Sequence, residues 1–229
     1  MLPASRARPH SPAVQAYLIF DLDGTLVDSL RGIADTLNRT LTAHGLPGHS
    51  DANVRGFIGN GLRNLVTRAA PAGADPSLID SLLAFYQKDY DLSWQYGSLP
   101  YPGVPAMLDA LQHDKFKMAV LSNKTHDFTT KMVRGIFPAV DFTQVLGQRD
   151  GQPHKPDPTG ALQLAAVMGA APENCIVIGD STMDIETAAN AGMRSIAVTW
   201  GYHDRHRLEA AGPGHIIDHP HELRPLLAS

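Results

Sequence analysis

Acidic side chains follow two apolar runs of the sequence in an arrangement suited to binding a metal ion. Asp21 and Asp23 come directly after the run 16–20, and Asp180 follows the run 175–178. In an extended chain, residues two apart point to the same side, so Asp21 and Asp23 project together. Two neighbouring carboxylates repel each other unless a cation lies between them or one takes a proton. Because carboxylate and carbonyl oxygens with water suit Mg²⁺, the sequence predicts a magnesium site.

Each acidic motif also has an ordinary structural interpretation. Asp23-Gly24 between two apolar runs is a hairpin signal, and a small flap could itself carry Asp23. Ser181, with Asp184 three residues later, fits a helix capping box. A capping box does not explain Asp180, however, so both interpretations stay open.

Two further motifs are suited to binding an anion. Ser122 and Asn123 end the apolar run 117–121, and a hydroxyl with backbone N–H groups at such a turn predicts a phosphate cradle. Lys155 stands in a proline-rich segment just ahead of a helix that Asp157 would cap. Its ammonium could offset the carboxylates and a phosphate. The alternatives are ordinary loop chemistry at the first motif and a solvated lysine at the second.

The elements that must position these residues alternate between strands and helices. Apolar runs predict strands at residues 16–20, 117–121, 144–146, 175–178, 195–198 and 215–217. Helical patterns lie between the later runs, as at Val104, Leu108 and Leu111. This alternation predicts an α/β fold with a doubly wound, mostly parallel sheet. All the polar motifs follow, or nearly follow, a strand of that sheet, so they could face one crevice.

Residues 30–96 break this alternation, because they contain no convincing strand. Leu30, Ile33 and Leu37 begin one helical stripe, and Pro76 opens a long helix near the end of the segment. A strand-to-strand connection of this length is unusual, so we predict a small all-helical cap domain inserted into the α/β core. Helices that simply cover one sheet face are the alternative. The catalytic core would then comprise residues 16–29 and 97–229.

Composition limits the remaining functions and partners. The chain has 229 residues, of which 43% are apolar and 18% charged, so it can bury a substantial core. Its 19 basic and 23 acidic side chains form no basic stripe, so neither nucleic acid nor a membrane is an expected partner. Cys175 is the only cysteine, which excludes an intrachain disulfide and cysteine-rich zinc sites. Residues 1–15 read as a flexible leader without a signal sequence, so a cytoplasmic location is expected.

Taken together, the motifs resemble those of the haloacid dehalogenase (HAD) superfamily and occur in its order. They are DLDGTLVDS at 21–29, the serine Ser122, the lysine Lys155 and GDSTMD at 179–184. The helical insert is similar to the small α-helical cap of that family. Asp23 favours phosphate chemistry, because haloacid dehalogenases lack this second acid. Short stretches, such as IGNG in the cap and ANAGM after the last motif, are most similar to phosphoglycolate phosphatases.

The resemblance implies a role for each matched residue. Asp21 would be the nucleophile that forms an aspartyl-phosphate, and Asp23 would act as the acid and then the base. Ser122, the amide of Asn123 and the catalytic Lys155 would hold the phosphoryl oxygens. The implied Mg²⁺ ligands are Asp21, the backbone carbonyl of Asp23, Asp180 and Asp184.

Further substrate contacts are predicted from the first motif and from the cap. Gly24 is assigned to phosphate binding. The Gly59-Asn60-Gly61 turn could place Asn60 or Arg63 over the substrate, with Arg55 as a third candidate. A plain turn between two helices is the alternative. His203 and His206 are read as part of a solvated helix start, and no zinc site is expected.

The function predicted from the sequence is Mg²⁺-dependent hydrolysis of a small phosphate monoester, with 2-phosphoglycolate as the first candidate. A phosphomutase and a pyrophosphate or nucleotide phosphatase are alternatives within the same superfamily. A phospho-ligand binding module is the alternative outside enzymes. The expected partner is a small phosphorylated metabolite, and the expected oligomeric state is a monomer or homodimer.

Overall fold

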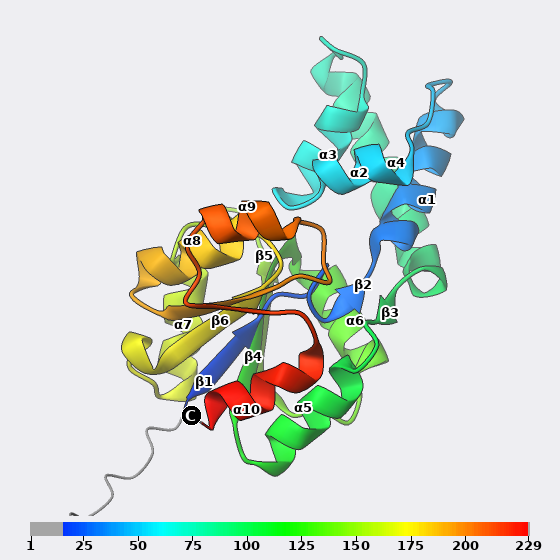
Figure 1. Cartoon of the computed structure of the whole chain (residues 1–229). Helices are drawn as coiled ribbons and strands as arrows, with labels where there is room; N and C mark the ends of the chain where they lie inside the picture. Colours follow the sequence, from blue (N-terminus) through cyan, green and yellow to red (C-terminus); the bar gives the residue numbers. More distant parts are fainter. Residues whose placement is uncertain (1–15, 229) are drawn as a thin grey trace, which may run out of the picture.

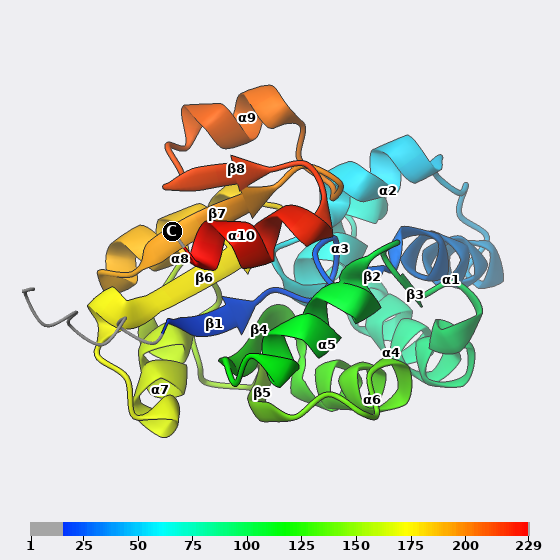
Figure 2. The same cartoon turned by 60° about the horizontal axis from the view of Figure 1, so that its bottom comes forward.

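A parallel six-stranded sheet carries the polar motifs at one edge. The computed structural model describes residues 16–228, so the predicted leader at 1–15 lies outside the described residues. The strand order is β5-β4-β1-β6-β7-β8, and every neighbouring pair is parallel, which confirms the predicted sheet (Figures 1 and 2). The strands are β1 Tyr17–Phe20, β4 Lys117–Thr125, β5 Phe142–Gln148, β6 Cys175–Gly179, β7 Arg194–Val198 and β8 His215–Ile217.

Helices cover both faces of the sheet because side chains alternate along its central strand. Leu18 and Phe20 of β1 belong to a core shared with α5, α6 and α10, whereas Ile19 packs with α7 and α8 on the opposite face (Figure 2). The core helices are α5 Val104–His113, α6 His126–Ile136, α7 Thr159–Met168, α8 Thr182–Ala191, α9 Arg205–Ala210 and α10 Leu223–Leu227, with short 3₁₀ turns η2 Pro172–Asn174 and η3 Pro220–Glu222. This arrangement is the doubly wound fold expected from the sequence.

The insert between β1 and β4 is helical, as predicted. It contains α1 Leu30–Ala43, α2 Asp51–Phe57, α3 Gly61–Ala69, α4 Pro76–Ser93 and the 3₁₀ turn η1 Trp94–Tyr96. These helices rise beyond one end of the sheet rather than covering a face of it (Figure 1). A two-stranded antiparallel ribbon, β2 Val27–Asp28 with β3 Leu99–Pro100, joins the insert to the core. The exact domain boundaries remain predictions.

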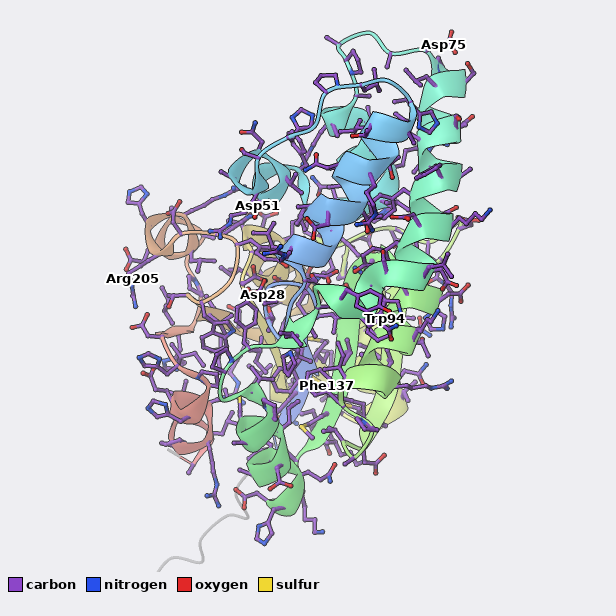
Figure 3. The ribbon with its side chains drawn as sticks, turned by 90° about the vertical axis from the view of Figure 1, so that its right-hand side faces the viewer. Asp28, Asp51, Asp75, Trp94, Phe137 and Arg205 are labelled. Carbon is purple, nitrogen blue, oxygen red and sulfur yellow. The ribbon has the colours of Figure 1, made fainter. Side chains whose placement is uncertain are left out.

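Capping residues fix the ends of the cap helices. Asp75 accepts a hydrogen bond from the Ser77 amide at 2.8 Å, and Pro76 takes the first helical position, as expected for a helix start. Ser50 caps α2, and its side chain accepts a hydrogen bond from the Asn53 amide. Figure 3 shows Asp75 at the far tip of the cap and Trp94 at its base, beside the core. None of the helices in residues 16–228 combines the length and apolar character needed to cross a membrane.

Candidate active site

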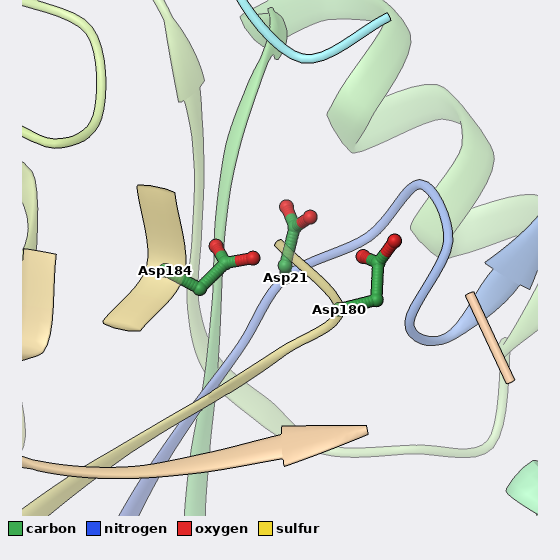
Figure 4. Close-up of side chains that lie close together, drawn as sticks. All are labelled: Asp21, Asp180 and Asp184. Carbon is green, nitrogen blue, oxygen red and sulfur yellow. The ribbon is translucent and has the colours of Figure 1, made fainter. Parts of the chain in front are cut away.

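Three aspartates meet at the carboxyl ends of the two central strands. Asp21 follows β1 and Asp180 follows β6, whose residues Phe20 and Ile178 are paired in register. Asp184 joins them from the first turn of α8 (Figure 4). All three residues are buried, and one carboxylate oxygen of each lies within 4.8 Å of the others. The structure therefore brings together the acids that the sequence predicted to meet.

The cluster is electrostatically unfavourable without a counter-charge. Burial raises the pKa of Asp21 well above its ordinary range, and the nearby carboxylates of Asp184 and Asp180 add to the effect. Burial and the Asp184 carboxylate raise the pKa of Asp180 to about 7. Three clustered carboxylates are the donor set that a hard divalent cation prefers. These residues therefore fit the predicted metal site.

Lys155 supplies the positive charge that the protein itself contributes to the cluster. Its Nζ lies 2.8 Å from Asp21 Oδ1 and 2.6 Å from Asp184 Oδ1, and its side chain is buried. Burial alone would lower the pKa of Lys155, but the Asp184 and Asp21 carboxylates outweigh it and the pKa is raised. Lys155 is thus a fixed cation at the site, and the alternative of a solvated lysine is wrong.

Asn123 holds the segment that carries Lys155. Its Oδ1 accepts a hydrogen bond from the Lys155 amide at 2.8 Å, and its Nδ2 donates to the Lys155 carbonyl at 3.1 Å. The same Nδ2 donates to the Gly59 carbonyl of the cap at 2.9 Å. The following helix starts at Thr159, two residues after Asp157, whose carboxylate accepts from the Thr159 amide. The carboxamide of Asn123 therefore links both lobes, and a phosphate contact through its backbone amide remains a prediction.

Asp180 sits in a space that two glycines leave open. Its carboxylate accepts hydrogen bonds from Thr25 Oγ1 at 2.9 Å and from the Tyr202 amide at 2.7 Å. A Cβ atom on Gly24, whose φ is +90°, would lie 2.3 Å from Asp180 Oδ2, and one on Gly201 would also collide with Asp180. The Gly24 amide already donates a hydrogen bond to the Val27 carbonyl. The absence of a side chain at Gly24 makes room for the Asp180 carboxylate, and the phosphate contact predicted for Gly24 stays a prediction.

Asp184 serves both as part of a helix capping box and as a member of the acid cluster. Asp184 Oδ2 accepts from the Ser181 amide at 3.1 Å and from Ser181 Oγ at 2.6 Å, which completes the predicted capping box. Its other oxygen, Oδ1, contacts Lys155 and faces the cluster. One carboxylate therefore ends a helix and contributes to the acidic centre.

Asp23 points to a different set of partners. Its carboxylate accepts a hydrogen bond from Ser29 Oγ at 2.5 Å and lies 3.2 Å from Lys124 Nζ. Amides of residues 25–27 turn back onto the Leu22 carbonyl, so the predicted small flap does carry Asp23. The sequence interpretation missed Lys124. The signal that could have found Lys124 is its place directly after the predicted Ser122-Asn123 turn.

A cavity of about 90 Å³ lies between the cap and this edge of the sheet, which is space for a small ligand. Its core side includes Asp21, Ser122 and Lys155, and its cap side is mainly apolar. The cap residues that line it are Ile33, Arg55, Ile58, Gly59, Gly61, Leu62, Leu65, Tyr86 and Tyr90.

The cap residues predicted to contact a substrate are only partly in place. Arg63 pairs with Asp80 at 2.6 Å on the exposed surface, and neither Arg63 nor Asn60 is among the described residues that line the cavity. Arg55 does line it, and its guanidinium makes no hydrogen bond or ion pair with the described part of the chain. In this structure the orientation of α3 turns Arg63 toward Asp80 of α4, and a substrate contact by Asn60 or Arg63 stays a prediction.

The sequence predicted that His203 belongs to a solvated helix start, and this prediction is wrong. His203 is half-buried and lines the cavity, and its Nδ1 accepts a hydrogen bond from the Thr182 amide at 3.2 Å. Burial lowers the pKa of His203, so the imidazole is neutral near pH 7. Tyr202, beside it, also lines the cavity and was likewise missed.

The fold, the acid cluster and the covering cap define a hydrolase of one family. The family described as "Haloacid dehalogenase-like hydrolase" matches residues 18–198, and the chain belongs to it. Phosphoglycolate phosphatase from Aquifex aeolicus is 31% identical over 92% of this chain and 95% of its own length. Phosphoglycolate phosphatase from Pseudomonas putida is 32% identical, covering 92% and 78%. A structure described as a "predicted phosphoglycolate phosphatase" from Haemophilus somnus 129PT has a TM-score of 0.87 at 27% identity, covering 93% and 98%.

Proposed function

We propose that the protein is a Mg²⁺-dependent phosphatase that hydrolyses a small phosphate monoester through an aspartyl-phosphate. The observation that carries this proposal is the position of Asp21, which lines the cavity and belongs to the buried acid cluster. The Lys155 ammonium lies 2.8 Å from the Asp21 carboxylate, so it can offset the negative charge of a phosphoryl group that Asp21 approaches. Asp21, Asp180 and Asp184 would hold Mg²⁺, which would neutralise carboxylate and phosphoryl charge when bound.

The residues of the chain divide the reaction into two steps. In the first, Asp21 attacks phosphorus, the ester P–O bond breaks, and Asp23 gives a proton to the leaving oxygen. In the second, Asp23 takes a proton from water as that water attacks the aspartyl-phosphate, so that phosphate leaves and Asp21 is restored. Lys155 and Ser122 would contact the phosphoryl oxygens during both steps.

The first candidate substrate is 2-phosphoglycolate. Relatives that cover most of this chain carry the name phosphoglycolate phosphatase, and the cavity has room for a small ester. Arg55 supports this choice, because its guanidinium lines the cavity without an ion-pair partner in residues 16–228 and suits a carboxylate on the far end of a substrate.

Phosphate release from p-nitrophenyl phosphate, with Mg²⁺ and with a chelator, tests the proposal. Activity should require the metal and be lost in Asp21→Asn, which keeps the shape of the side chain but not its nucleophilicity. Turnover that survives this substitution would mean a different nucleophile. A panel of 2-phosphoglycolate, sugar phosphates, nucleotides and pyrophosphate then ranks the substrates. Conversion of one sugar phosphate isomer to another would identify a phosphomutase instead.

A further inference from the structure

Lys124 occupies a position between the proposed acid–base residue and the cap. Its side chain is 10% exposed, and its Nζ lies 3.2 Å from both carboxylate oxygens of Asp23. The same Nζ lies 4.6 Å from the ring centroid of Tyr90, which belongs to α4 of the cap. One ammonium therefore contacts the core flap and the cap at once.

The ammonium depends on these two contacts. Asp23 is the sole carboxylate within ion-pair distance of Lys124 among residues 16–228. A buried ammonium needs such a partner, and the face of an aromatic ring adds a second favourable contact. Burial alone would lower the pKa of Lys124, but Asp23 and Tyr90 outweigh it, so the group remains a cation.

The contacts also fix how the Asp23 carboxylate is oriented. Oδ1 of Asp23 accepts hydrogen bonds from the Ser29 hydroxyl and the Lys124 ammonium. Oδ2 accepts one from the Lys124 ammonium alone among residues 16–228. Ser29 Oγ in turn lies 2.9 Å from the Tyr202 hydroxyl. A carboxylate has about four acceptor positions, so this network leaves Oδ2 the less committed oxygen. Oδ2 is thus the atom best placed to carry a proton to or from the cavity.

We infer that Lys124 is a positioning residue that aims the Asp23 carboxylate at the leaving oxygen while Tyr90 of the cap covers its ammonium. This inference rests on the proposed function. Movement of α4 away from the core would replace the ring with water and weaken the ion pair, because Coulomb attraction falls as the local dielectric rises. Lys124 thereby makes the alignment of Asp23 depend on the closed position of the cap.

Leaving-group dependence separates this role from a structural one. An alkyl phosphate such as 2-hydroxyethyl phosphate needs protonation of its leaving oxygen, whereas p-nitrophenolate leaves readily without it. Lys124→Met, which keeps the apolar stem, should lower kcat on the alkyl ester by about 10- to 100-fold, part of what a general acid contributes. The loss on p-nitrophenyl phosphate should be at least ten times smaller. Tyr90→Leu should follow the same pattern, and Tyr90→Phe, which keeps the ring, should recover most of the rate.

The chain offers a matched control. Lys131 of α6 pairs with Asp91 of α4 at 2.5 Å, so it also joins the cap to the core, but on the exposed surface. Lys131→Met should leave both rates unchanged. Equal losses on the two esters in Lys124→Met would reveal a structural role and overturn the inference, as would no loss at all.

A third ester identifies the remaining alternative. If Lys124→Met raised KM for 2-phosphoglycolate but not for 2-hydroxyethyl phosphate, Lys124 would bind the substrate carboxylate, and the positioning role would be wrong. Absence of phosphate release by the unaltered protein from all three esters would instead refute the proposed function. The two failures are therefore distinguishable.

Discussion

Replacing Asp180 with asparagine should stabilise the metal-free protein at pH 8, although it removes a predicted metal ligand. The folded-state pKa of Asp180 is raised to about 7 from an ordinary 3.8. The folded protein therefore binds a proton between these values that the unfolded chain has released. The stabilisation from that proton is complete below about pH 4 and is lost as the pH rises through 7. Above pH 7 the folded state must bury a charged Asp180.

The size of the effect follows from two opposing contributions. A pKa displaced from 3.8 to about 7 corresponds to about 4 kcal/mol at 1.36 kcal/mol for each tenfold change in affinity. Asparagine keeps one acceptor oxygen, but its NH₂ group would face either Thr25 Oγ1 or the Tyr202 amide, which both donate to Asp180. A lost hydrogen bond of this kind costs about 1–2 kcal/mol. The net gain at pH 8 is about 2–3 kcal/mol, or roughly 5–10 °C in Tm for a chain of this size.

Thermal unfolding in EDTA at pH 8 and pH 5 measures this difference. At pH 5 the folded wild-type protein already holds the proton, so the advantage of Asp180→Asn should disappear or reverse. Addition of Mg²⁺ at pH 8 should raise the Tm of the wild-type protein more than that of the variant. A variant no more stable than wild type at pH 8, or equally stabilised at both pH values, would refute the electrostatic reasoning.

Three further outcomes are expected. Arg55→Gln should raise KM for 2-phosphoglycolate about tenfold or more, because it removes a charge-assisted hydrogen bond to the substrate. Arg63→Gln, which removes only the ion pair with Asp80, should leave KM unchanged. Steady-state kinetics on both variants measures this difference. Gly24→Ala should abolish Mg²⁺ binding measured by calorimetry, whereas Gly45→Ala, at a similar φ of +71° with no atom nearby, should affect only stability. Mg²⁺ affinity should rise with pH through about 7, because Asp180 must lose its proton to bind; a flat titration would contradict this.

Local sequence patterns predicted the sheet and its central acids because both depend on short-range signals. The apolar runs before Asp21 and Asp180 form neighbouring parallel strands in register, so residues one or two positions beyond them meet. The strand predicted at 117–121 is longer, however, and continues to Thr125. Thr125 pairs with Gln148 of β5, so the polar end of β4 is held in the sheet by its partner strand. A contact of this range leaves no mark in local hydrophobicity.

The contacts that the sequence did not predict join segments that are far apart in the chain or lie on different elements. Arg55 and Arg63 occupy neighbouring helices, and only the three-dimensional arrangement assigns one to the cavity and the other to Asp80. Lys124 belongs to a common strand-end motif, and its partners Asp23 and Tyr90 come from the flap and from α4. Such pairings join segments distant in sequence, so residue type and spacing alone could not identify them.

The balance of charge explains why so many acids are tolerated in one buried place. Asp21, Asp23, Asp180 and Asp184 face two ammonium groups, one on each side of the site. Among residues 16–228, Lys124 pairs with Asp23, and Lys155 pairs with both Asp21 and Asp184, which leaves two of the four negative charges without a cationic partner. Burial and the neighbouring carboxylates raise the pKa values of Asp21 and Asp180, which favours the uptake of protons by these groups in the metal-free protein. One divalent cation carries the same charge, so Mg²⁺ would replace protons rather than lysines, and the lysines would stay free to orient Asp23 and the phosphoryl group.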